Sequence, residues 1–198
     1  KKIIFSSVVP KKFKLIKAFL LKNLKLKSLE IKDLNTKKLI KISVNRKQIG
    51  SDRLCNAIGI NDNMNNYIIV DFGTATTFDV ISKDGNYEGG VIAPGINLSL
   101  EALYMAASRL PRIGIDEPYY KSVIGKNTKD SMRSGIYWGY ISLIEGIIKR
   151  IKKETKTNSI VIATGGLSNL FSKDCSAIQL VDEDLTIKGL VHIFNINN

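Results

Sequence analysis

The sequence predicts an α/β protein in two parts, of which the second is the more complete. Three short strands follow one another after residue 67, and helices and strands then alternate to the last residue. The first 66 residues alternate between strand and helix from the start. Since 44% of the 198 residues are hydrophobic, the chain can bury a substantial core.

The first part opens with a short strand and an amphipathic helix. Residues 3–9 are apolar and β-branched and are followed by a proline, as in a buried strand. Residues 11–24 place apolar side chains near helical spacing among lysines, which predicts a helix with one apolar face. A further strand is expected within residues 29–42, and residues 54–60 have the pattern of a helix.

The second part opens with three adjacent strands, at residues 67–70, 76–82 and 87–93. The Asp84-Gly85 step between the last two predicts a tight hairpin turn. The alternating elements that follow are helices at 98–110, 128–153, 167–171 and 185–194 and strands at 160–163 and 178–181.

The longest of these helices is expected to run from about Thr128 to Lys153. Glycines at positions 135, 139 and 146 lie on one face of this helix, which fits close packing at a dimer contact. Core packing within one subunit would explain them equally well. Its apolar face is expected to consist of Ile136, Tyr140, Leu143, Ile147 and Ile151.

The order of the elements identifies the architecture. Three strands, helix, strand, helix, strand and helix form a ribonuclease-H-like unit, the half-module of actin-like and sugar-kinase ATPases, and residues 67–198 contain one such unit. Residues 1–66 show only the closing strand, helix, strand and helix. We therefore expect two related lobes with mixed sheets, at residues 1–66 and 67–198, the first incomplete. Because the sequence starts at Lys1, within such a lobe, we expect a fragment or a processed chain.

The composition excludes several classes of protein. No apolar run approaches the roughly 18 residues of a membrane-spanning helix, and the basic start lacks the features of a signal peptide. We therefore expect a cytoplasmic protein without a membrane partner. Cys55 and Cys175 belong to no C-x-x-C pair, so reduced, buried thiols are expected. His192, the one histidine, cannot supply an H-E-x-x-H metal site.

The formal net charge of +12 arises in the first 50 residues, which hold 15 basic residues against two acidic ones. Only six of the 30 cations in the chain are arginine, whereas a dedicated nucleic-acid surface more often shows arginine with interleaved aromatic residues. We therefore favour a solvated basic surface over a nucleic-acid site. Binding of a polyanion stays open as an alternative.

The strongest chemical signal is Asp71-Phe72-Gly73-Thr74-Ala75-Thr76-Thr77. An acidic residue at the end of a strand, followed by glycine and threonine, forms a tight turn that can hold phosphate oxygens, while the carboxylate can hold a cation. Such a turn can supply much of the catalysis of a kinase, because phosphoryl transfer depends mostly on positioning and charge neutralisation. An ordinary hairpin turn is the alternative. Neither a Walker A loop nor a G-x-G-x-x-G segment is present.

A second constellation is Gly50-Ser51-Asp52-Arg53, at the expected start of a helix. Asp52 can act as a base toward a substrate hydroxyl, while Arg53 binds an acid group of the same substrate. A helix cap beside a surface arginine would show the same residues.

The combination of the two segments resembles type III pantothenate kinase. Asp71 to Ile81 follows Gly50-Ser51-Asp52-Arg53 by about twenty residues, and the resemblance spans essentially the whole chain in the family's order. The further matching segments are Ser6-Ser7-Val8-Val9-Pro10, Gly89-Gly90-Val91-Ile92-Ala93-Pro94-Gly95, Arg109-Leu110-Pro111, Gly125-Lys126-Asn127-Thr128, Ser134-Gly135, Thr164-Gly165-Gly166 and Asp184 to Leu190.

The resemblance implies a kinase of the actin-like ATPase superfamily that phosphorylates pantothenate with ATP, the first step toward coenzyme A. It implies that Asp52 accepts the proton of the pantothenate hydroxyl. Gly50, Ser51 and Arg53 would contact the same substrate, with Arg53 suited to its carboxylate. Thr128 would contact pantothenate from the partner subunit of a homodimer.

On the nucleotide side, the resemblance implies that Gly73 and Thr74 contact ATP. It also implies that Asp71 binds the monovalent cation, potassium or ammonium, that the family requires, with magnesium as a further metal. Gly165 and Gly166 are additional candidates for this side, although a strand that ends on two glycines also lets a helix pack closely.

The sequence departs from the family in two places. The family opens with an Asp-x-Gly-Asn-Thr strand and turn that forms the other phosphate and magnesium clamp, and no segment here matches it. Without that clamp, catalysis would be nearly lost. Ahead of Gly50, the family usually carries a tyrosine and a proline facing the substrate, where this chain has Ser43-Val44-Asn45-Arg46. A non-catalytic relative that acts as an accessory transcriptional regulator is the alternative function.

Overall fold

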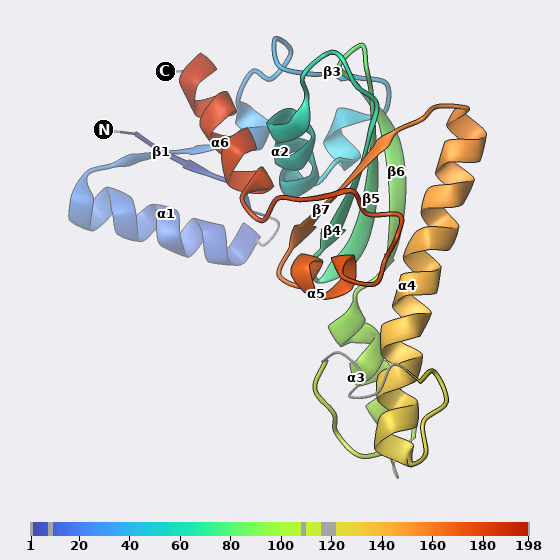
Figure 1. The fold of residues 1–198 in the computed structure, drawn as a ribbon. Coiled ribbons are helices and arrows are strands. Elements are labelled where there is room, and N and C mark those ends of the chain that lie inside the picture. Colours follow the sequence, from blue (N-terminus) through green and yellow to red (C-terminus); the bar gives the residue numbers. More distant parts are fainter. Residues whose placement is uncertain (1, 8–9, 108–109, 116–121, 198) are drawn as a thin grey trace. The chain divides into compact units, whose positions relative to one another are not determined.

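The computed structural model describes residues 2–7, 10–107, 110–115 and 122–197, and it shows an α/β protein (Figure 1). The described residues form two compact units, each drawn from several segments of the chain. The predicted lobe boundary after residue 66 stays a prediction. Unit 1 comprises residues 1–67, 79–89 and 184–198, and unit 2 comprises residues 68–78 and 90–183.

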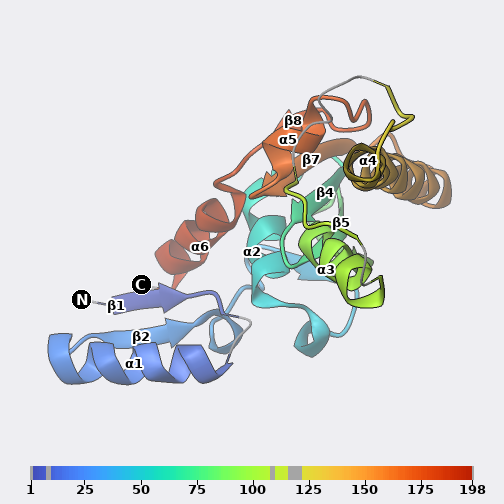
Figure 2. The ribbon, with the colours of Figure 1, turned by 90° about the horizontal axis from the view of Figure 1, so that it is seen from below.

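In unit 1, two short parallel strands are joined by a helix. Strand β1 (Lys2–Phe5) pairs with β2 (Lys27–Glu30), and α1 (Pro10–Leu24) connects them. Figure 2 shows α1 running alongside β2. Helix α1 is fixed from its inner face by Phe13, which is buried and meets Phe5 edge-on with ring centroids 5.6 Å apart.

The central sheet has six strands in the order β3-β6-β5-β4-β7-β8. The β3–β6 and β7–β8 pairs are parallel, and β5 and β6 are joined by a short turn. That turn closes at Gly85, whose φ of 70° is a conformation that favours glycine and whose N–H donates to Ser82 O at 2.9 Å. The bounds are β3 (Lys41–Ile42), β4 (Tyr67–Phe72), β5 (Ala75–Ser82), β6 (Asn86–Pro94), β7 (Ile160–Gly165) and β8 (Leu180–Val181).

The predicted elements are largely confirmed. The three adjacent strands become β4, β5 and β6, and the hairpin turn lies at the Asp84-Gly85 step. The strand expected within residues 29–42 is instead two short strands, β2 and β3, near either end of that range. Of the strand expected at 3–9, Val8 and Val9 lie outside the described residues. The helices are α2 (Ser51–Ile60), α3 (Ile96–Ala106), α4 (Thr128–Thr155), α5 (Ser168–Ser172) and α6 (Leu185–Ile196).

The buried face of α4 is confirmed at Ile136, Tyr140 and Ile151 and differs from the expected one at two positions. Leu143 and Ile147 are only half-buried, whereas Ile144 and Ile148 are buried. Branched apolar residues occupy several sides of this helix, so helical spacing alone does not define the inner side. The glycine face is exposed at Gly135 and Gly139, where an added Cβ would meet no described atom within 4 Å. Core packing among the described residues therefore does not explain these two glycines.

The core of unit 2 lies where β4 and β7 are adjacent. Ile69 and Val161 are fully buried there. Beside them, Phe171 of α5 stacks on Phe72 at 5.5 Å and on Tyr137 of α4 at 5.3 Å between ring centroids. These rings connect the end of β4 to two helices, so the chain that follows β4 starts from a rigid position.

In unit 1, helices α2 and α6 pack at unusually close range. A Cβ added to Gly189 would lie 1.9 Å from Cys55 O, and one added to Gly59 would lie 2.5 Å from Leu185 O. Thr186 also donates a hydrogen bond of 2.6 Å to the buried side-chain oxygen of Asn56. Only glycine at these positions allows the two helix backbones to approach in this way.

We therefore expect Gly189→Ala to destabilise the protein by about 1–3 kcal/mol, because the new methyl group must push a backbone carbonyl away. Urea unfolding followed by circular dichroism measures this change. Gly146→Ala on α4 is the matched control: its Cβ would meet only the end of the flexible Arg150 side chain, at 3.4 Å. The control should gain up to about 1 kcal/mol from helix propensity, and an equal loss in both variants would contradict the argument.

Both cysteines are free and buried, as expected. Burial raises the pKa of the Cys55 thiol from 9.0 to about 12, and burial also raises that of Cys175. Because the folded protein binds the Cys55 proton more tightly, this contribution to stability is complete below pH 9 and is lost as the pH rises from 9 toward 12. We expect neither thiol to react with a thiol reagent at pH 8 until urea is added; rapid labelling of the native protein would contradict this.

Candidate active site

The expected base, Asp52, lies in the first turn of α2. Its Oδ1 accepts a hydrogen bond of 2.8 Å from Arg53 N. Gly50 is the N-cap of this helix, and a Cβ there would lie 2.5 Å from the same Asp52 oxygen. The glycine therefore makes room for the carboxylate, which is half-buried.

Ser51 ties the start of α2 to the segment after β1. Its hydroxyl accepts from the Ser6 hydroxyl at 3.2 Å and donates to Ser7 O at 3.3 Å. Two segments of the sequence resemblance, Ser6-Ser7 and Gly50 to Arg53, thus meet at one place in unit 1.

Arg53 is held from the inside of unit 1. Its Nε and one Nη atom lie 2.8 and 2.7 Å from Oδ1 of Asp79, which is fully buried on β5. Burial lowers the pKa of Arg53, but the hydrogen bond to Asp79 and the negative charge of Asp79 raise it by more. The pKa of Arg53 therefore lies above its usual value. Asp79 received no role from sequence reasoning, although an acidic residue among the apolar residues of a strand is a signal for one.

A cavity of about 890 Å³ lies beside Gly50 and Ser51, and all its lining residues belong to unit 1. Its size is within the range of small-molecule sites. Asn45 and Arg46, from the segment that departs from the family, line the same cavity, and Arg46 also donates to Leu34 O at 2.9 Å. The full lining is Ser7, Glu30, Ile31, Asp33, Asn45, Arg46, Lys47, Gln48, Ile49, Gly50, Ser51 and Leu54.

In unit 2, the expected phosphate turn joins β4 to β5. Gly73 and Thr74 are exposed at its tip, and Gly73 N donates to Ala75 O at 3.2 Å. Gly95, the N-cap of α3, lies so close that an added Cβ would be 2.1 Å from Thr74 O. The N-terminus of α3 therefore reaches the turn, and its free N–H groups add partial positive charge where phosphate would bind.

Asp71 precedes this turn and faces a glycine of β7. Gly165 has a φ of 88°, and an added Cβ would lie 2.7 Å from Asp71 Oδ1 and 2.7 Å from Phe72 O. The described residues contain no group of three or more histidine, cysteine, aspartate or glutamate side chains suited to a metal ion. Asp71 Oδ1 and Phe72 O, which both lie near Gly165, are oxygen atoms of the kind that hard cations prefer, and Mg²⁺ commonly uses substrate phosphates to complete its ligands.

Thr128 is the first residue of α4 and is exposed. The preceding Asn127 caps the helix, because its side chain accepts from Asp130 N at 3.0 Å. Gly125 packs against this first turn, where a Cβ would lie 2.3 Å from Ser131 N. The Gly125 to Thr128 segment is thus a helix start. Gly166 is open, with no described atom within 4 Å of an added Cβ.

A glycine-containing turn between two strands and a carboxylate at a helix start, on an α/β fold, form the combination expected of a phosphotransferase. A family model described as type III pantothenate kinase matches residues 1–150. A type III pantothenate kinase of Pelagibacter ubique is 53% identical over 190 residues, 96% of this chain and 75% of the relative. The chain belongs to the type III pantothenate kinase family, and the function of that family is phosphorylation of pantothenate for coenzyme A biosynthesis.

A second relative agrees with this assignment, and one solved structure shares the fold. A type III pantothenate kinase of Paramagnetospirillum magneticum is 52% identical over 153 residues, and the match spans 77% of this chain and 58% of that relative. A solved structure from Campylobacter jejuni, described as a conserved Baf family transcriptional activator, has a TM-score of 0.66 over 100% of this chain and 83% of its own. Its sequence identity is 20%, so this likeness shows the shared fold.

No helix among the described residues is long and apolar enough to span a membrane.

Proposed function

We propose that the protein transfers the γ-phosphoryl group of ATP to pantothenate, with Asp52 as the base. The observation that carries this proposal is the Asp52 carboxylate at the start of α2, directly after Gly50 and Ser51, which line a cavity of about 890 Å³. Asp52 takes the proton from the pantothenate hydroxyl as the hydroxyl oxygen forms a bond to the γ-phosphorus of ATP. The bond between that phosphorus and the oxygen that bridges it to the β-phosphorus breaks. The products are ADP and 4'-phosphopantothenate.

For the nucleotide we propose a site at the exposed turn of unit 2. Gly73 and Thr74 would offer backbone N–H groups and a hydroxyl to the phosphates, supported by the N-terminus of α3. Asp71 would hold the monovalent cation together with nearby carbonyl oxygens. Magnesium would enter with ATP, and both cations neutralise phosphate charge when bound.

The experiment that tests this function uses the full-length protein, ATP and pantothenate, with and without potassium. We expect 4'-phosphopantothenate, detected by mass spectrometry, only when ATP is present, and a faster rate with potassium. Absence of product under all conditions would contradict the proposal and would favour the non-catalytic alternative. The presence of both Asp52 and Asp71 speaks for the kinase.

We further propose a homodimer formed through the first half of α4. Its outer side there carries Gly135, Gly139 and Ser142, all exposed. Helix α3 packs beside α4 (Figure 1). Large apolar side chains are exposed on α3 and just before α4, and such a surface usually marks an interface. They are Leu98 at 53%, Met105 at 73%, Val123 at 62% and Ile124 at 72% of full exposure. Thr128 begins this half of α4 and would reach the partner's substrate.

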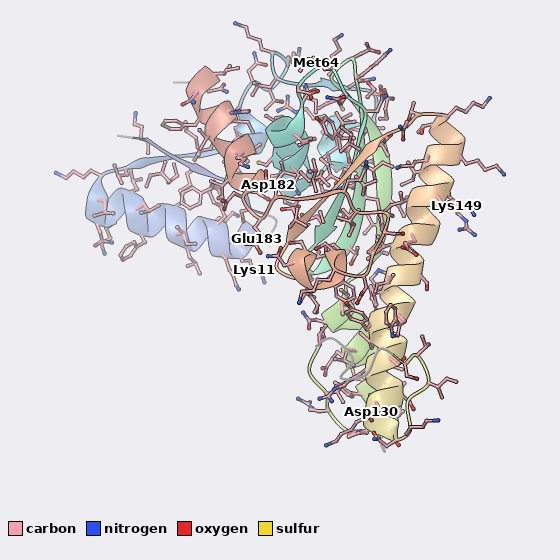
Figure 3. All side chains as sticks on the ribbon, viewed as in Figure 1. Lys11, Met64, Asp130, Lys149, Asp182 and Glu183 are labelled. Atoms are coloured by element: carbon pink, nitrogen blue, oxygen red, sulfur yellow. The ribbon has the colours of Figure 1, made fainter. Side chains whose placement is uncertain are left out.

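Gly139→Glu should convert the dimer to a monomer, because two carboxylates would face each other across the symmetry axis. Like charges in an interface cost several kcal/mol, which raises the dissociation constant by at least about 10²-fold. Lys149→Glu is the matched control, since Lys149 lies on the outer side of the later half of α4 (Figure 3). Light scattering after gel filtration measures both variants; an intact Gly139→Glu dimer would overturn the proposed interface.

A further inference from the structure

One oxygen atom of the buried Asp79 carboxylate has three donor atoms within hydrogen-bond distance. Two of them are nitrogens of Arg53, at 2.8 and 2.7 Å, and the third is the hydroxyl of Tyr87 on β6, at 2.5 Å. The side chain of Asp79 has no exposed surface, whereas that of Arg53 is 13% exposed. All three residues belong to unit 1, and Arg53 directly follows the proposed base.

The orientation of the guanidinium group is fixed on more than one side. Arg53 Cζ lies 6.0 Å from the centroid of the Tyr87 ring, so the ring contacts the group that Asp79 holds. Burial raises the pKa of Tyr87, and the charge of Asp79 raises it further. Tyr87 therefore stays a hydroxyl donor at physiological pH and contributes no competing charge.

The contacts with Asp79 use only some of the N–H groups of Arg53. A guanidinium has five N–H groups, and the fork on Asp79 uses the Nε hydrogen and one Nη hydrogen. The remaining three can bind a carboxylate in the planar, two-pronged way that arginine favours. A lysine has a single charged nitrogen and cannot both pair with Asp79 and present a fixed fork to a ligand.

We propose that Asp79 and Tyr87 are positioning residues, which hold Arg53 so that its free N–H groups receive the carboxylate of pantothenate next to Asp52. This inference rests on the proposed function. Burying an ion pair costs free energy and rarely adds net stability, so stability alone does not account for this pair. Fixing the direction of a substrate-binding arginine is a function that does account for it. Neither residue touches the substrate; both act through Arg53.

The test compares Asp79→Asn, Tyr87→Phe and Arg53→Gln in the full-length protein. Asp79→Asn should raise KM for pantothenate about 10- to 100-fold, the range of a lost charge-assisted hydrogen bond. Tyr87→Phe keeps the ring and should raise it by a smaller factor. In both variants kcat and KM for ATP should change less than about threefold, because the base and the phosphate turn are untouched.

The double variant Arg53→Gln with Asp79→Asn separates positioning from a general structural role. If Asp79 acts through Arg53, the double variant should have the same KM for pantothenate as Arg53→Gln alone. Additive effects, or equal losses in kcat and both KM values, would overturn the inference. If Asp79→Asn does not fold, the same comparison of single and double variants with Tyr87→Phe in its place tests the inference. Failure of the proposed function is a separate result, namely no product from the unaltered protein.

Discussion

Replacing Asp52 with asparagine should lower kcat for pantothenate phosphorylation by about 10²- to 10⁴-fold, the usual contribution of a positioned general base. The amide keeps the shape of the side chain and its contact with Arg53 N but cannot accept the hydroxyl proton. KM for pantothenate and for ATP should therefore change little. Steady-state kinetics of the full-length protein measure all three quantities.

The matched control is Asp33→Asn, because Asp33 is an exposed carboxylate that lines the cavity beside Gly50 and Ser51. It should keep kcat within about threefold of the unaltered protein, since surface substitutions away from a reacting group have small effects. Equal activity of Asp52→Asn and the unaltered protein would remove Asp52 as the base. Equal losses in both variants would indicate a general effect of cavity charge.

Replacing Asp71 with asparagine should lower kcat/KM for ATP by about 10²-fold, comparable to the loss of one preorganised charge-stabilising group. The change removes the Asp71 carboxylate, which lies beside Gly165 and directly precedes the proposed phosphate turn. It should also abolish activation by potassium, which is measured by titrating the rate with potassium chloride at constant ionic strength.

Asp84→Asn serves as the comparison for this second variant, because Asp84 is exposed in the β5–β6 turn. It should respond to potassium as the unaltered protein does. A full potassium response in Asp71→Asn would place the cation elsewhere, and a loss of response in both variants would point to a nonspecific salt effect.

Local patterns predicted most of the fold. The strands β4 to β6 are short apolar segments separated by glycine-containing turns, and both signals are local, so their bounds agree with the structure within about two residues. Strand β3 has two residues and depends on pairing with β6, which no local pattern encodes. Helix α3 ends at Ala106, four residues before the expected residue 110, and helix ends are the part of an element that local patterns define least.

The candidate site, like the fold, could be predicted from the sequence only in part. Asp52 and Asp71 stand out in the sequence because each occurs in a short motif with its own chemistry. The partnership of Arg53 with Asp79 joins residues 26 positions apart and exists only after β5 has packed beside α2. The role of Gly95 is similar, since its closeness to Thr74 O arises from the meeting of two separate segments. Contacts of this kind are products of tertiary structure and cannot be derived from local spacing.

The close packing of α2 against α6 has a consequence for how the protein is made. The helix that carries Asp52 ends at residue 60, whereas its partner begins at Leu185. At about 5–20 residues per second, a ribosome needs on the order of ten seconds to synthesise the chain between them. During that interval the side of α2 that carries Gly59 is not yet covered by α6. The order of synthesis therefore separates the appearance of Asp52, the proposed base, from the docking of α6 on its helix.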